Sequence, residues 1–261
     1  MRLIQVILVI LGGLIGSMAL SAEPSYSGIA LNQANAMQMQ LCTLKPGKTM
    51  ANYDRVVNGY IEWSKENDVE VFFIRAMPLF MSANPGGGPQ FDFMELLVSP
   101  YDVSADGWTK WLGTEDGQKL NDQWQDTADC RVAMNSGRIH VIDQEALANT
   151  DERVMTFNWC SRHEGVSVDQ LRAKHQQMAS EWTTASPVKA WLTMVPGLGG
   201  RNTPGDFAHI LSFDSINSLM AWQNIQANEQ GWRQRVDYEA SYAHCTGENA
   251  YYGQVLNRPG S

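Results

Sequence analysis

The sequence is poor in positive charge. Its 261 residues include 19 Lys and Arg against 28 Asp and Glu, which gives a formal net charge of −9. Binding to nucleic acids or to anionic membranes needs positive charge, so this composition argues against both kinds of partner. Charged residues make up only 18% of the chain and apolar residues 44%, a balance that excludes global disorder and allows a sizeable core.

The sequence also lacks the short motifs of several enzyme classes. It contains no Gly-x-Ser-x-Gly elbow, no glycine-rich loop followed by Lys-Ser or Lys-Thr, and no Cys-x-x-Cys pair. A serine nucleophile, a phosphate loop, a thioredoxin-like site and a zinc ribbon are therefore unsupported. His140, His163 and His244 show no ligand spacing, so we expect neither a metal site nor a cofactor.

Only one long apolar run is present, and it lies at the N-terminus. Residues 1–22 contain Met-Arg, an apolar run of about 13 residues and a small-residue end, which is typical of a secretory signal peptide. An uncleaved membrane anchor is the alternative. Because no second long apolar run follows, we expect a periplasmic or secreted protein that leaves the membrane once this segment is removed.

An exported chain can form disulfides, and four cysteines are present: Cys42, Cys130, Cys160 and Cys245. An even number suggests two bridges, for which three pairings are possible. The first two cysteines lie 88 residues apart and the last two 85. This near-equal spacing points to an internal repeat.

The two halves of the chain share further markers in the same order. Trp63 follows Cys42 by 21 residues, and Trp182 follows Cys160 by 22. The other matched pairs are Pro78 with Pro196, Asp92-Phe93 with Asp206-Phe207, and Trp108 with Trp222. A period of about 115 residues means two copies of one domain. We place the copies at residues 36–142 and 154–256, joined by a polar linker at 143–153.

Each copy reads as strand, helix, strand, strand, helix, strand. In the first copy we expect strands at 37–44, 70–77, 91–99 and 137–142, a helix from Thr49, and a helix over 105–127 with a break near 113–117. In the second we expect strands at 154–161, 189–195, 207–213 and 250–256, a helix from Ser167, and a helix over 215–242. This βαββαβ order is the ferredoxin-like arrangement, so the fold class is α+β, with two ferredoxin-like repeats and antiparallel sheets.

The ferredoxin-like arrangement also implies a disulfide pairing. Its first and last strands are antiparallel neighbours, so the end of the first strand lies beside the entry to the last. Those are the positions of Cys42 and Cys130, and of Cys160 and Cys245. We therefore expect one bridge in each copy.

Two such copies in one chain resemble the dimeric α/β-barrel superfamily, in which two ferredoxin-like sheets face each other. The resemblance covers residues 36–256 and rests on element order, size and duplication. The superfamily includes cofactor-free monooxygenases, isomerases and cyclases as well as haem-binding peroxidase-like and chlorite dismutase-like enzymes. The resemblance therefore implies one pseudo-dimeric barrel but no particular chemistry.

Three residues are candidates for acid–base chemistry. Glu95 and His209 each follow the repeated Asp-Phe by the same offset and are the one polar residue in an apolar third strand. His175 lies on the apolar stripe of the helix where the first copy has Val57. A titratable group in such a place is costly unless it is paired, which suggests either a functional pocket or a satisfied buried residue.

Trp191 and Arg201 are candidates for ligand binding. Trp191 is not repeated in the first copy, whereas the recurrence of Trp63, Trp108, Trp182 and Trp222 favours packing. Arg201 lies in the second of two glycine-rich loops, 84–89 and 197–205, where it could hold an anionic group.

Two functions are compatible with these observations. The first is an exported protein that binds a small apolar or aromatic molecule. The alternative is a cofactor-independent monooxygenase, isomerase or lyase that uses Glu95, His209 and His175. A haem-binding or purely structural module is less favoured, and the sequence leaves a homo-oligomer open.

Overall fold

The computed structural model describes residues 24–82, 90–201 and 203–260. The expected signal peptide and the first glycine-rich loop lie outside these residues. Within the described part of the chain, no helix has both the length and the apolar character needed to cross a bilayer.

The two halves repeat the same order of elements. The first half consists of β3 (Ala34–Leu44), α1 (Met50–Glu66), β4 (Phe72–Phe80), β5 (Phe93–Ser99), α2 (Tyr101–Gly113), α3 (Glu115–Thr127) and β6 (Ala128–Ile142). The second consists of β7 (Glu152–Arg162), α5 (Val168–Ser180), β8 (Ala190–Leu198), β9 (Phe207–Phe213), α6 (Ile216–Asn228), α7 (Gly231–Ser241) and β10 (Ala243–Asn257). A short hairpin, β1 (Ser25–Tyr26) and β2 (Ile29–Ala30), precedes them, and α4 (Gln144–Ala148) connects them.

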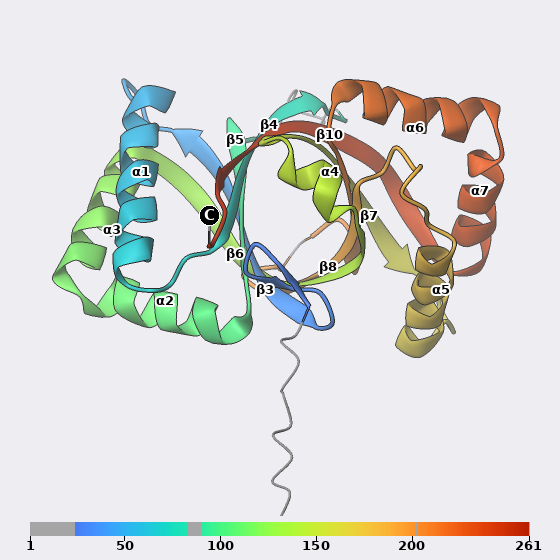
Figure 1. Cartoon of the computed structure of the whole chain (residues 1–261), viewed down its shortest axis with the longest axis horizontal. Helices are drawn as coiled ribbons and strands as arrows, with labels where there is room; N and C mark the ends of the chain where they lie inside the picture. The colour runs from blue at the N-terminus through green and yellow to red at the C-terminus, as the bar shows by residue number, and fades with distance from the viewer. Residues whose placement is uncertain (1–23, 83–89, 202, 261) are drawn as a thin grey trace, which may run out of the picture.

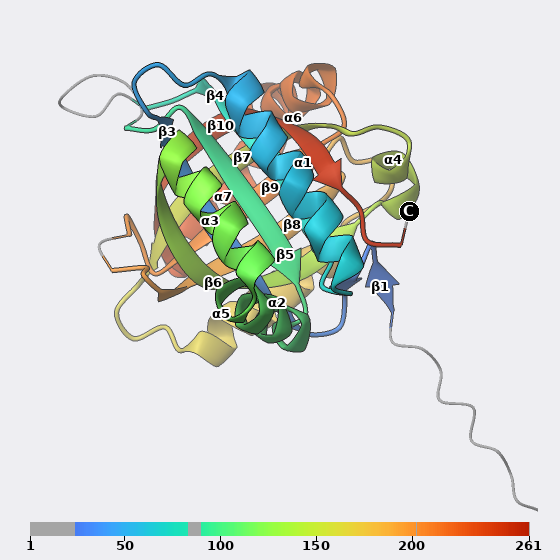
Figure 2. The same cartoon turned by 90° about the vertical axis from the view of Figure 1, so that its left-hand side faces the viewer.

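The eight long strands close into one barrel in the order β10-β4-β5-β3-β6-β8-β9-β7. Within each half the order is that of a ferredoxin-like sheet, and the halves are joined where β4 pairs with β10 and β6 pairs with β8. All neighbouring strands are antiparallel. The helices cover the outside on two opposite sides, α1 to α3 on one and α5 to α7 on the other (Figures 1 and 2). The structure thus confirms the expected fold class.

Local sequence signals fix the first helix of each half. Thr49 and Ser167 are the N-caps, and each forms a capping box with the residue three positions on, Asn52 or Gln170. These boxes satisfy backbone N–H groups that would otherwise have no partner at the start of the helix.

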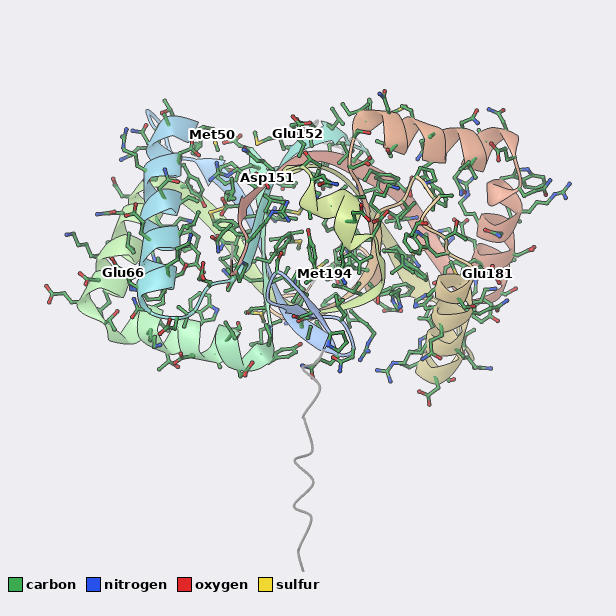
Figure 3. All side chains as sticks on the ribbon, viewed as in Figure 1. Met50, Glu66, Asp151, Glu152, Glu181 and Met194 are labelled. Carbon is green, nitrogen blue, oxygen red and sulfur yellow. A yellow bond between two sulfur atoms is a disulfide. The ribbon has the colours of Figure 1, made fainter. Side chains whose placement is uncertain are left out.

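The barrel interior is filled with side chains. Residues that point inward alternate with residues that face the helices, as the pleat of a strand requires. Met37, Met94, Met155 and Met194 belong to the interior cluster, and Tyr26 of the β1–β2 hairpin packs into it. Figure 3 shows Met194 within this crowded interior.

Both expected disulfides are present. Cys42 lies directly opposite Cys130 on β3 and β6, and Cys160 lies directly opposite Cys245 on β7 and β10. The second cysteine of each pair lies within the last strand rather than in the loop before it.

Several elements differ in their bounds from the sequence-based expectation. The last strands begin at Ala128 and Ala243, not at 137 and 250, because their first halves are partly exposed and show no apolar alternation. The expected helix over 215–242 is two helices, with a turn after Asn228. The segment 143–153 contains α4 and the buried Arg153, whose guanidinium donates to the carbonyls of Leu147 and Thr150.

Candidate functional site

The candidate residues Glu95 and His209 face the helices, not the barrel interior. On β5, Met94 and Leu96 point into the barrel, and on β9, Ala208 and Ile210 do so. Their neighbours Glu95 and His209 must then point to the opposite face. Each half therefore has its own polar site between the outside of the barrel and its helices.

In the first half Glu95 belongs to an ion-paired network. Its Oε1 accepts a hydrogen bond from Arg75 Nε at 3.0 Å, and its Oε2 accepts one from Tyr53 Oη at 2.8 Å. Arg75 also pairs with Asp54 at 2.5 Å. Burial raises the pKa of Glu95, and the Arg75 guanidinium opposes part of that rise. Each oxygen of the buried Glu95 carboxylate thus has one hydrogen-bond partner.

In the second half His209 belongs to an uncharged network. Trp191 Nε1 donates to His209 Nδ1 at 3.0 Å, and His209 Nε2 lies 3.1 Å from Tyr238 Oη. Tyr238 Oη also lies 2.9 Å from His175 Nε2. An indole N–H can only donate, so His209 is neutral and carries its proton on Nε2. The hydrogen bonds then run in one direction, from Trp191 through His209 and Tyr238 to His175.

The pKa values of this cluster agree with neutral imidazoles. Burial and the neighbouring His140 lower the pKa of His175 to about 3. Burial and Arg138 lower the pKa of His140 to about 4, and burial together with the other two histidines lowers that of His209. The His175 ring centroid lies 5.1 Å from that of His209 and 5.3 Å from that of His140. The structure therefore brings together two predicted candidates and adds His140.

The two networks occupy equivalent positions with different residues. Glu95 lies opposite Arg75 on β4 and Gln40 on β3. His209 lies opposite Thr193 on β8 and Asn158 on β7. An acid and its basic partner in one copy thus correspond to an imidazole and a hydroxyl in the other. Duplication has produced two sites of different chemistry.

A large cleft lies beside His209 between α5, α6, α7 and the barrel, and we call it the second-half cleft. Its volume is about 1020 Å³. Its inner wall is formed by aromatic and apolar side chains together with His209, namely Met178, Trp182, Trp191, Leu211, Leu219, Trp222 and Tyr238. Glu181, at the end of α5 in Figure 3, belongs to its polar outer part.

Helix packing explains why the second-half cleft is large. In the first half α1 has 17 residues and packs directly against α3. In the second half α5 has 13 residues and does not approach α7 as closely. Figure 1 shows α5, α6 and α7 spread around their side of the barrel. Beside Glu95 the first half has a cavity of about 90 Å³, which we call the first-half cavity.

Trp222, which lines the second-half cleft, differs from its counterpart Trp108 in its hydrogen bonding. Among the residues that the structure describes, its Nε1 is buried and has no partner. The equivalent Trp108 donates to Gln38 Oε1 at 3.1 Å. In the first half Gln38 lies opposite Leu97. In the second half Leu211 takes the place of Leu97, and the residue opposite it is Thr156. The shorter threonine leaves the indole N–H of Trp222 unpaired.

The remaining candidates lie as follows. Trp191 is buried, lines the second-half cleft and holds His209. Arg201 is exposed in the turn after β8 and is not among the residues that line either space. Across residues 24–82, 90–201 and 203–260, no group of three or more His, Cys, Asp or Glu is arranged to hold a metal ion.

Sequence reasoning missed Tyr53, Arg75 and Tyr238, which hold the candidate residues in place. Tyr53 lies one helical turn after the N-cap Thr49, and Arg75 is a charged residue within an apolar strand. An unpaired charge in a buried strand predicts an opposite charge next to it, so Arg75 could have been matched with Glu95. Tyr238 gave no comparable signal.

Comparison with solved structures identifies the class of fold. The chain aligns with a candidate monooxygenase from Fusobacterium nucleatum at a TM-score of 0.53 and 10% identity, over 87% of this chain and 94% of that one. It aligns with a candidate monooxygenase from Lactobacillus acidophilus at 0.53 and 7% identity, over 86% of this chain and 100% of the other. The protein has the dimeric α/β-barrel fold, with both halves in one chain. No family model and no curated protein sequence matches the chain.

Proposed function

We propose that the protein is an exported binding protein for a small aromatic molecule that carries a hydrogen-bond acceptor, and that the second-half cleft is the binding site. The unpaired Trp222 Nε1–H is the observation that carries this proposal, because a buried donor without a partner costs free energy until a ligand supplies an acceptor. The aromatic wall and the volume of about 1020 Å³ suit such a ligand. Export is supported by the two disulfides.

The alternative is a cofactor-independent monooxygenase, isomerase or lyase that uses Glu95, His209 and His175 as acid–base groups. Both oxygens of Glu95 already accept hydrogen bonds, from Arg75 and Tyr53. A general base needs a lone pair that the substrate can reach. The Nδ1 lone pair of His209 accepts from Trp191, and the Nε2 lone pair of His175 accepts from Tyr238. The same hydrogen bonds leave no unengaged His209 nitrogen for a haem iron. The arrangement therefore favours binding over catalysis.

Binding can be tested with two probes that differ only in the acceptor, 2-acetylnaphthalene and 2-ethylnaphthalene. We expect the ketone to bind about tenfold more tightly to the wild-type protein, the difference that one neutral hydrogen bond provides. Trp222→Phe should abolish this preference and leave the affinity for 2-ethylnaphthalene nearly unchanged. Fluorescence titration measures both affinities.

Variants at the paired positions serve as matched controls. Thr156→Gln should provide a hydrogen-bond acceptor for Trp222, as Gln38 does for Trp108. It should therefore weaken the binding of the ketone and leave that of 2-ethylnaphthalene nearly unchanged. Trp108→Phe, in the first half, should leave both affinities unchanged. A ketone preference that persists in Trp222→Phe, or equal affinities in the wild type, would contradict the proposal.

A further inference from the structure

The first-half cavity is lined largely by aromatic side chains. It lies between the barrel and α1, α2 and α3, and has a volume of about 90 Å³. Seven aromatic side chains line it: Tyr53, Tyr60, Trp63, Phe73, Trp108, Trp111 and Trp124. Helix α2, which forms one side, has no fully buried residue and so provides the outer wall.

The cavity presents acceptors and no basic group. Among its described lining residues, Glu95 is the one carboxylate, and no Lys, Arg or His accompanies it. Gln40 also lines the cavity and is 7% exposed, and its Oε1 is buried without a hydrogen-bond partner in the described part of the chain. Buried polar atoms in folded proteins are normally hydrogen-bonded, so an acceptor of this kind can take a donor from a ligand.

The charges around Glu95 do not cancel. Arg75 is shared between the buried Glu95 and the half-exposed Asp54, so the three groups carry one excess negative charge when all are ionised. In the described part of the chain Arg75 Nη2 is buried without a partner. Each Glu95 oxygen accepts one hydrogen bond, from Arg75 or from Tyr53, and a carboxylate oxygen can accept a second. A cation in the cavity would balance the charge, and its N–H groups would reach Glu95 and Gln40.

We propose that the first-half cavity binds a small alkylammonium ion, with its N–H groups on Gln40 Oε1 and Glu95 and its alkyl part against the aromatic rings. Aromatic faces attract cations most strongly where water is excluded. The volume indicates a small ligand, since a cavity of about 150 Å³ takes one benzene molecule. This site is separate from the second-half cleft and does not depend on the function proposed there.

The test compares isopropylammonium with isopropanol, which has nearly the same shape but no charge. Calorimetric titration of the full-length protein should show the ammonium binding at least tenfold more tightly. Glu95→Gln should remove this preference, and Gln40→Leu should weaken the binding of the ammonium severalfold. Glu62→Gln, an exposed acid on α1, is the matched control and should change neither affinity.

Near-UV circular dichroism should establish that each variant is folded. If Glu95→Gln does not fold, Gln40→Leu decides, because this residue takes part in no ion pair of the network. The proposal is overturned if the wild type binds neither probe or binds both equally. It is also overturned if the Glu95→Gln variant still prefers the ammonium. Where that variant does not fold, an unchanged ammonium affinity in Gln40→Leu overturns the proposal.

Discussion

A single indole N–H sets the charge of the second-half site. Trp191 donates to His209 Nδ1, so protonation of that nitrogen would place two donors against each other. Neutral His209 must then donate through Nε2 to Tyr238 Oη, and the Tyr238 hydroxyl in turn donates to His175 Nε2. The hydrogen bonds of this cluster therefore join uncharged groups, whereas those of Glu95 join charged ones.

Neutral buried histidines make the stability of the fold depend on pH. The folded pKa of His175 is about 3, below its ordinary 6.5, so between these values the unfolded chain binds a proton that the folded chain does not. The free energy of unfolding should then fall as pH falls, by up to about 1.4 kcal/mol per pH unit for each such histidine. His175→Val, which copies Val57 of the first half, should flatten this slope.

Urea unfolding between about pH 7 and about pH 5 measures the slope, since most carboxylates titrate below that window. His244→Val, at an exposed position outside the cluster, is the control. An unchanged slope in His175→Val would show that the imidazole does not carry the effect.

The sequence predicted that Glu95 and His209 occupy equivalent positions in the two copies, but not the face of the sheet on which they lie. Strand alternation places Glu95, Phe93 and Leu97 on one side and leaves open which side that is. The answer depends on which face the helices cover, a tertiary feature. The free N–H of Trp222 likewise became visible only from the cross-strand register that aligns Thr156 with Gln38.

At the scale of elements, the duplication predicted most of the architecture because each strand and helix is supported by its counterpart. The errors fall where local signals are weak. The first halves of β6 and β10 are held by pairing with β3 and β7, not by apolar alternation of their own. The break between α6 and α7 follows the same Glu-x-Gly spacing as the break between α2 and α3, and that repeat could have revealed it.

The two disulfides should stabilise the fold equally. They close loops of nearly the same length, with separations of 88 and 85 residues, and both join directly opposed residues on neighbouring strands. The loop-entropy account gives up to about 4.5 kcal/mol for each. Cys42→Ala with Cys130→Ala, and Cys160→Ala with Cys245→Ala, should therefore lower the free energy of unfolding in urea by similar amounts. A clear difference between the two double variants would contradict the loop-entropy explanation.

At the scale of the whole molecule, the closed barrel makes the two halves one structural unit. In an isolated ferredoxin-like half, one side each of β4 and β6 would be an unpaired edge, and such edges invite aggregation. Here β4 pairs with β10 and β6 with β8, so the two halves complete each other. The interior cluster also draws residues from both halves, among them Met37, Met94 and Met194.

This shared barrel predicts that the halves unfold together. Leu219→Ala removes a side chain of α6 that is 2% exposed, which should cost about 2–5 kcal/mol. The substitution lies only in the second half, but β5 and β9 belong to one barrel. Amide hydrogen exchange through global unfolding should therefore accelerate by the same factor in both strands. Mass spectrometry of peptides from β5 (Phe93–Ser99) and β9 (Phe207–Phe213) gives the two rates. If β9 exchanges faster while β5 keeps its protection, the halves open independently and the barrel is two units in contact.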